Sequence, residues 1–352
     1  MTWDVDYLRD NRDENMGFLS KTLLPDGTEI PGTNFDYNYL QHRKVDVVSS
    51  ALDFILPFEK YKITAGAKVS FTNTRNGINY DTSDPTLVQD DYFRYKEQIY
   101  ALYADYSREF SERFSMQLGL RMEHTRTTGI SEAKDTEDKH DYTRLFPTVY
   151  LLYSPTDGHA LNFSFSNRIS RPSQNMVNPF PFYQNKYTYA CGREDLKPSY
   201  TYNVELGYTL KNNFNVSAYY SYSDDVFFQV VDLDAETNVT SFLWENFMQT
   251  HAFGLNNSYT FRTKWLQAYA QHGVSYRRTT SSAATTSPEE KGWAYDASLR
   301  NTFFFNEKKT LLATLSGSYS SRQYQGIYLM SPLTVSVQVC FTGCWTISSA
   351  SA

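Results

Sequence analysis

Six histidines are the side chains whose type best suits metal binding or acid–base catalysis in this 352-residue sequence. They are His42, His124, His140, His159, His251 and His272. None of them stands in an HExxH or other paired-ligand spacing, and we find no GxSxG, P-loop or strand–helix GxGxxG motif. We therefore interpret all six as wall or surface residues, and we predict no enzyme, no catalytic residue, no metal site and no cofactor.

Two further groups have the chemistry for metal binding but lack the pattern. The cysteines are Cys191, Cys340 and Cys344. The last two lie close together, but the second Cys or His pair of a zinc site is missing. An acidic run does not follow the spacing of an EF-hand, and we interpret it as a solvated loop. Its members are Glu132, Asp135, Glu137 and Asp138.

Composition indicates which elements hold these residues. No run approaches the roughly 18 apolar residues of a membrane-spanning helix, and the mean hydropathy is -0.54. Aromatic residues make up 16% of the chain, with 29 Tyr and 24 Phe. Such rings suit strands and membrane–water boundaries, although an aromatic-rich soluble β-protein is an alternative. A net charge of -6 without a basic block argues against nucleic acid as a partner.

Apolar and polar residues alternate with a period of two through most of the chain. In one example Leu118, Leu120 and Met122 alternate with Gly119 and Arg121. The pattern predicts strands with one apolar and one polar face, many of them longer than the strands of soluble sandwiches. We predict about fourteen strands, near residues 2–9, 43–58, 62–79, 92–110, 113–130, 142–154, 159–170, 199–210, 213–230, 246–261, 265–279, 291–305, 309–321 and 327–341.

The predicted connections alternate between short turns and long polar loops. The long set comprises residues 10–42, 80–91, 131–141, 171–198, 231–245 and 280–290. Short periplasmic turns and long outer loops are typical of an outer-membrane barrel, so we predict an all-β, antiparallel transmembrane β-barrel. Aromatic residues flank the short turns and predict a girdle at the periplasmic interface. They are Phe58, Tyr61, Phe110, Phe114, Tyr153, Phe214, Phe261, Trp265 and Phe305.

The segment from 164 to 208 is the most specific part of the sequence. It reads S-N-R-I-S-R-P, then N-P-F, a glycine, L-K-P and N-V-E-L-G-Y. Its marked residues are Arg168, Arg171, Pro172, Asn178, Pro179, Phe180, Gly192, Leu196, Pro198 and Glu205. In order and spacing this segment resembles the barrel of Bacteroidetes-type TonB-dependent receptors, and strand lengths and loop asymmetry extend the resemblance over nearly the whole chain.

The resemblance implies a barrel of about 22 strands in the outer-membrane lipid, a plug domain inside it and contact with the TonB complex. It also implies uptake of a nutrient such as a siderophore, vitamin, glycan or peptide, without indicating which. We expect residues 1–341 to supply about fourteen of the strands and residues 342–352 to form an atypical tail. No signal peptide opens the chain, and we expect it to be part of a longer receptor.

The marked residues also have local interpretations. Pro172 and Pro198 suit strand ends, and Gly192 suits a positive φ in the loop. For Arg168 and Arg171 we favour bridges to loop carboxylates over contacts with a plug or ligand. The loop aromatics have the chemistry to stack on sugars or aryl groups, but we favour packing of the loop against itself. They include Tyr183, Tyr187 and Tyr189.

Two other functions stay open from the sequence. The first is a plugless, porin-like or structural outer-membrane barrel of about fourteen strands, which would conduct ions in planar bilayers. The second is a soluble, aromatic-rich β-sandwich binding module, which would be expressed as a monomer without detergent.

Overall fold

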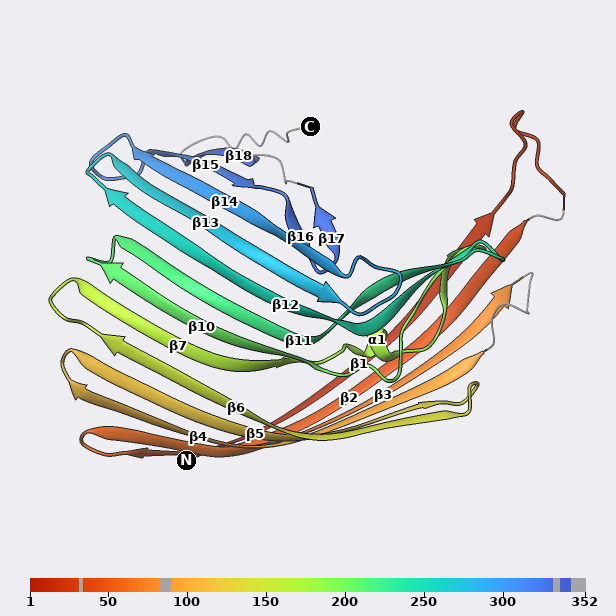
Figure 1. Cartoon of the computed structure of the whole chain (residues 1–352), viewed down its shortest axis with the longest axis horizontal. Coiled ribbons are helices and arrows are strands. Elements are labelled where there is room, and N and C mark those ends of the chain that lie inside the picture. Colours follow the sequence, from red (N-terminus) through yellow and green to blue (C-terminus); the bar gives the residue numbers. More distant parts are fainter. Residues whose placement is uncertain (32–33, 83–89, 332–335, 343–352) are drawn as a thin grey trace.

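Fourteen long strands pair in chain order to form one curved antiparallel sheet, shown in the computed structural model of Figure 1. The structure describes residues 1–31, 34–82, 90–331 and 336–342, the last range by its backbone alone. The strands of this sheet are β1 (Thr2–Ser20), β2 (Phe35–Pro57), β3 (Tyr61–Thr82), β4 (Asp91–Ser111), β5 (Phe114–Ser131), β6 (Thr136–Tyr153), β7 (His159–Ser170), β10 (Ser199–Leu210), β11 (Phe214–Asp234), β12 (Val239–Arg262), β13 (Leu266–Ser281), β14 (Glu289–Phe304), β15 (Leu312–Ser320) and β18 (Ser336–Thr342). The predicted all-β fold and the predicted number of wall strands are confirmed.

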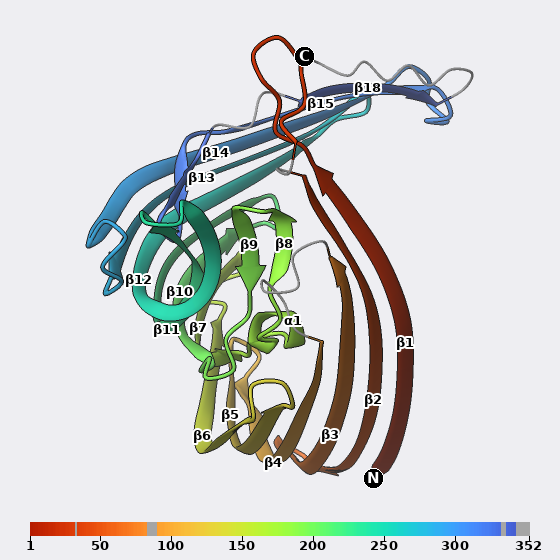
Figure 2. The ribbon, with the colours of Figure 1, turned by 90° about the vertical axis from the view of Figure 1, so that its right-hand side faces the viewer.

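Within the described residues, β1 pairs only with β2 and β18 only with β15. The sheet is therefore a curved wall and not a closed ring, as Figure 2 shows. It is one sheet and not two packed sheets, so the alternative of a soluble β-sandwich is wrong. In the described part of the chain, no helix has the length and apolar character needed to cross a membrane.

Several strands run further than the alternation of residue types predicts. The predicted loops 10–42, 131–141 and 231–245 contract to the connections 21–34, 132–135 and 235–238. In residues 10–20 of β1 backbone pairing continues although the side chains no longer alternate, since a hairpin in water tolerates polar groups on both faces. The predicted strand 327–341 is divided between β17 (Tyr328–Met330), which pairs with β16 (Gln323–Gln325), and β18. Residues 343–352 of the predicted tail lie outside the described residues.

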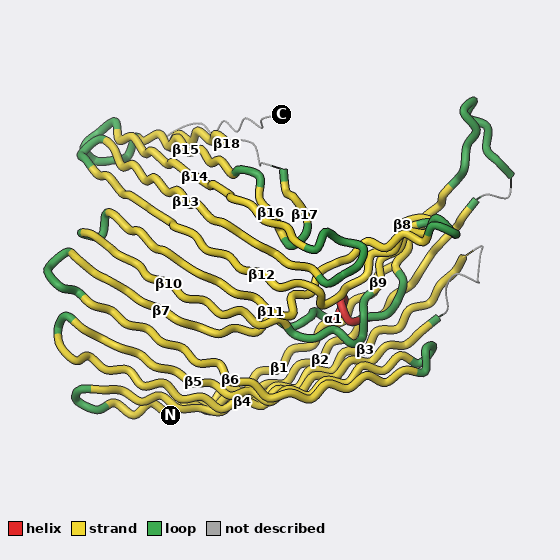
Figure 3. Tube along the Cα trace, in the orientation of Figure 1, coloured by secondary structure: helices red, strands yellow, loops and turns green. Residues whose placement is uncertain are grey.

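Short turns gather at one end of the wall, whereas the other end has the long connections together with two four-residue turns, 132–135 and 235–238 (Figure 3). Aromatic pairs mark the short-turn end, with ring centroids 4.4 Å apart for Phe58 and Tyr61 and 5.4 Å apart for Phe110 and Phe114. Large apolar side chains that alternate with polar ones project from the convex face. Leu102, Leu120, Leu206, Leu255 and Leu299 are each about half exposed or more. So wide an apolar surface suits lipid and not water.

Residues 171–198, here called the mouth loop, fold inward from the wall. The mouth loop contains α1 (Gln174–Val177), β8 (Phe182–Asn185) and β9 (Thr188–Cys191). Figure 2 shows these elements enclosed by the curve of the sheet. β9 pairs in parallel with β12, from Thr188 beside Thr240 to Cys191 beside Leu243. The largest buried apolar cluster of the described residues lies where this loop meets the wall.

Candidate functional site: the mouth loop on the inner wall

An apolar cluster holds the mouth loop against β2, β3 and β4. Its buried members are Phe35, Tyr37, Tyr39, Ile78 and Phe93 from the wall, and Val177, Phe180, Tyr183 and Leu196 from the loop. The hydroxyl groups of Tyr37 and Tyr80 both donate to the Pro181 carbonyl at 3.2 Å. The aromatic side chains of the wall therefore supply apolar contact area for the loop, and their hydroxyl groups supply hydrogen bonds that hold it in place.

Asn178 and Gly192 form the tightest crossing within the loop. Asn178 is 1% exposed, and its carbonyl accepts from the Gly192 N–H at 2.9 Å. The Arg193 N–H donates to the Met176 carbonyl at 2.8 Å. A Cβ on Gly192 would lie only 2.7 Å from the Asn178 nitrogen. Gly192 is not among the positive-φ glycines of the described residues, so that prediction is wrong, and close backbone approach explains the glycine instead.

Arg171 ties the start of the mouth loop to two wall strands. Its Nη2 donates to Glu123 Oε2 on β5 at 2.5 Å and to Thr125 Oγ1 at 3.2 Å. Its Nε lies 3.8 Å from Glu97 Oε2 on β4. Glu123 also accepts from Arg121 Nε at 2.6 Å, and its side chain is 9% exposed. The predicted partners were loop carboxylates, whereas the actual partners belong to the wall.

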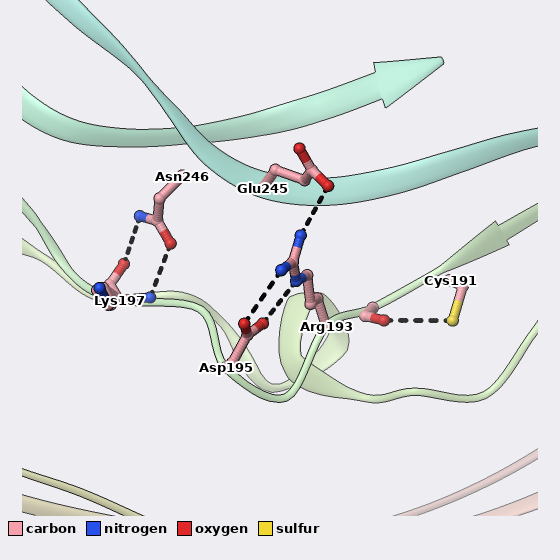
Figure 4. Close-up of polar contacts among 7 residues, drawn as sticks. Cys191, Arg193, Asp195, Lys197, Glu245 and Asn246 are labelled. Carbon is pink, nitrogen blue, oxygen red and sulfur yellow. Dashed lines mark hydrogen bonds and ion pairs between the residues drawn. The ribbon is translucent and has the colours of Figure 1, made fainter. Parts of the chain in front are cut away.

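The end of the mouth loop is tied to β12 (Figure 4). Arg193 Nη1 donates to Glu245 Oε1 at 2.6 Å, and Arg193 Nε donates to Asp195 Oδ1 at 2.6 Å. The Asn246 side chain pairs with the backbone of Lys197: its Oδ1 accepts from the N–H at 2.8 Å and its Nδ2 donates to the carbonyl at 2.9 Å. The Asn246 side-chain amide thus satisfies both backbone groups of Lys197, as a neighbouring strand would do in a sheet.

Contacts with the β5–β6 hairpin complete the attachment. Lys134 Nζ donates to the Pro179 carbonyl at 3.3 Å, and Thr136 Oγ1 donates to Glu194 Oε2 at 3.0 Å. Burial, together with a hydrogen bond to Asp138, raises the pKa of the Glu194 carboxyl. Burial also raises the pKa of the Cys191 thiol. The loop is therefore fixed to three sections of the wall, and its ionisable groups are partly withdrawn from water.

The other predicted residues lie around this network. Pro172 follows β7 and Pro198 precedes β10, at strand ends as predicted. Arg168 lines a recess of about 520 Å³ on the inner wall together with Arg121 and Glu123, and it has no ion-pair partner among the described residues. Glu205 is exposed on the inner face of β10, opposite Tyr219 of β11.

The three loop tyrosines differ in exposure. Tyr183 is 8% exposed, with ring centroids 5.3 Å from both Tyr37 and Tyr189. Tyr189 is half-buried, whereas Tyr187 is 53% exposed. Packing therefore accounts for the first two rings, and Tyr187 alone of the three presents its face outward.

Sequence reasoning missed most of the wall partners of the loop. Tyr37 and Tyr39 fell inside a predicted loop, although Phe35, Tyr37 and Tyr39 alternate with Asp36 and Asn38 and signal a strand. No local pattern marks the other partners, Glu97, Glu245 and Asn246. The acidic run was placed in a loop, but Glu137 and Asp138 belong to β6, where Glu137 pairs with Lys139 at 2.9 Å.

All six histidines lie on wall strands, and four of them bond to wall side chains. His42 pairs with Asp13 at 2.7 Å, His159 with the Tyr208 hydroxyl at 2.7 Å, and His251 with the Tyr220 hydroxyl at 2.8 Å. The described ranges contain no group of three or more His, Cys, Asp or Glu side chains arranged to hold a metal ion.

The mouth loop lies against the inner side of the curved polar wall and narrows its opening. This arrangement suits the binding and passage of a solute.

A family comparison places this geometry among known proteins. Residues 1–339 match the model of the outer membrane protein beta-barrel family. The chain belongs to this family. Its place is therefore the bacterial outer membrane, with the convex apolar face in lipid, as the sequence predicted. No curated protein matches the sequence.

Solved structures with the same fold are TonB-dependent receptors. The copper transporter OprC superposes with a TM-score of 0.63 at 12% identity, over 94% of this chain and 56% of that one. The siderophore receptor PiuA from Acinetobacter baumannii gives 0.56 at 12% identity, over 94% and 57%. The ferric yersiniabactin uptake receptor FyuA from Yersinia pestis gives 0.55 at 12% identity, over 96% and 50%. This chain thus spans about half the length of these neighbours.

Proposed function

We propose that this chain forms wall and mouth of a TonB-dependent outer-membrane receptor, which imports a nutrient with a plug domain in its lumen. The observation that carries the proposal is the mouth loop, which folds against the inner side of the wall at the outer end and leaves the inner face at the short-turn end uncovered. At the short-turn end, the inner face exposes Tyr150 and Leu152 at 43% and 45% around a recess of about 640 Å³. A domain inserted into the lumen would cover these two exposed side chains.

The charged groups of the inner wall support the same reading. Arg168 lacks an ion-pair partner in the described part of the chain, and it shares a recess with the Arg121–Glu123 pair. An unpaired guanidinium facing a lumen suits a carboxylate of an inserted domain or of a solute. Tyr187, exposed at the mouth, supplies a ring for stacking on a sugar or aryl group of an incoming nutrient.

A porin-like barrel is the second candidate function, and one observation favours it. The fourteen wall strands are an even number, as in closed single-chain barrels. Against it stands the mouth loop, because three sets of contacts hold it against the inner side of the wall, where it would obstruct an open pore.

Energy-dependent uptake tests the proposal. Cells that carry the native gene and cells that lack it would be given labelled ferric siderophores, cobalamin, oligosaccharides and peptides in separate assays. We expect gene-dependent uptake of one class, abolished by a protonophore. Uptake that persists after the membrane is de-energised, together with a stable open conductance in planar bilayers, would instead establish the porin.

A further inference from the structure

Two cations lie side by side on the convex face of β13 and β14. The register pairs Arg278 with Lys291, and both project outward because the adjacent Arg277 donates inward to the Tyr324 carbonyl at 3.2 Å. Both bind Glu289, whose carboxylate accepts from Lys291 Nζ at 2.6 Å and from Arg278 Nε at 2.6 Å. Their side chains are more than half exposed. Two cations share one carboxylate, so the patch keeps one positive charge.

An aromatic cluster lies directly beneath this cation patch. The rings of Phe253, Tyr276 and Trp293 have centroids 5.2 to 5.6 Å apart, and Trp293 is 62% exposed. Tyr276 follows Trp265 of the short-turn end by about eleven positions, or about 28 Å along the membrane normal for a strand tilted by about 40°. This matches an apolar band of about 25 Å, so the rings mark the outer interface and the cations lie at headgroup level.

An apolar groove of about 490 Å³ lies beyond the aromatic cluster, toward the membrane centre. The cation patch, the aromatic cluster and this groove are together called the column. The outward-facing lining of the groove includes Ala270, Ala297, Leu299, Leu315 and Tyr319 from β13, β14 and β15. Lys291 and Ala297 are about six positions apart on β14, or roughly 15 Å along the membrane normal. That separation is half of a hydrocarbon core of about 30 Å, the depth of one leaflet.

We propose that this column binds a phosphate-bearing lipid of the outer leaflet, with its phosphate on Arg278 and Lys291 and an acyl chain in the groove. Charge complementarity selects this occupant: a guanidinium and an ammonium share one carboxylate, and phosphate oxygens accept from both. Another cation of the convex face, Arg9, does not share its carboxylate in this way. Arg9 lies 2.6 Å from its own carboxylate, Asp46. The site lies outside the wall and does not depend on what passes through it.

Native mass spectrometry of the detergent-purified full chain tests the proposal, with lipid A carrying two phosphates as the probe. Lys291→Gln should weaken retention of this lipid about fivefold, the loss expected for one cation near a membrane surface. Arg9→Gln is the matched control, since it removes an outward cation with a carboxylate of its own, and retention should stay unchanged. Equal weakening by both variants would show general charge attraction and overturn the site.

Two further measurements separate the phosphate from the chain. Lipid A stripped of its phosphates should bind wild-type protein and the Lys291→Gln variant equally. Ala297→Phe fills the groove and should weaken both forms of the lipid, whereas unchanged binding of both would remove the groove from the proposal. Complete displacement by inorganic phosphate would show an anion site without a lipid. Circular dichroism of each variant confirms that the sheet is intact.

Discussion

Replacing Arg171 by Met should loosen the mouth loop without unfolding the wall. Breaking a buried ion pair by removing one partner costs about 3–5 kcal/mol when nothing compensates. In the variant, Glu123 keeps its ion pair with Arg121, and the Arg171 side chain is already 22% exposed to water. These two features should offset much of the cost of losing the Arg171 bridge. We expect the docked loop to lose about 1–2 kcal/mol, which raises the open population roughly 5- to 30-fold.

Hydrogen exchange measures this opening where it occurs. The amides of Gly192 and Arg193 donate across the loop to Asn178 and Met176, so both lose protection when the loop opens. In Arg171→Met their exchange should accelerate by the same 5- to 30-fold factor, while amides of the wall strands keep wild-type rates.

Arg168→Met is the matched control, because Arg168 lies near the same end of β7 without an ion-pair partner in the described part of the chain. It should leave loop exchange unchanged. In a double-mutant cycle, Arg171→Met and Glu123→Gln should be non-additive by about 1 kcal/mol. Additive effects, or an Arg168→Met variant as loose as Arg171→Met, would refute the assigned bridge.

Three further outcomes are expected. Gly192→Ala should weaken loop docking by about 1–3 kcal/mol, since the added Cβ meets fixed backbone, and the same exchange assay would detect it; wild-type protection would contradict the close approach. Leu206→Arg should destabilise the wall by about 2–4 kcal/mol in urea-induced unfolding from lipid vesicles. Glu205→Arg, at the neighbouring lumen-facing position, should leave the stability close to that of the wild type. A larger loss of stability in Glu205→Arg than in Leu206→Arg would mean that the two faces are assigned the wrong way round. The raised pKa of Glu194 means that its protonated form favours the fold, so loop protection should fall as pH rises from about 4.3, the unfolded pKa, through the higher folded value. Glu194→Gln should flatten this profile, and a profile that rises with pH would refute the sign.

The wall was predictable because its physics is local. Side chains on one face of a strand recur every second residue, so Leu118, Leu120 and Met122 reveal a lipid-facing strand without knowledge of its neighbours. The strand ends were not predictable in the same way. Beyond the bilayer, both faces of β1 and β12 meet water or protein, and the alternation that defined them disappears although their backbones remain paired.

The contacts of the mouth loop were out of reach because their partners are distant in the chain. Arg171 and Glu123 stand 48 residues apart, and only the order of the strands brings them together. A spacing motif marked Arg171, Asn178 and Gly192 as special without stating why. The structure supplies separate reasons: a charge bridge for the first, and a backbone crossing between the other two.

The pairing of β9 with β12 explains why the loop folds inward at all. β13 ends at Ser281, opposite Met248, so the outer part of β12 extends past its neighbour and would present unpaired backbone groups. An edge of that kind invites pairing with another chain. β9 covers it from Thr240 to Leu243, and Asn246 holds the Lys197 backbone just below. One segment therefore both protects an edge and narrows the opening, and a variant that releases the loop should expose a strand edge as well as widen the mouth.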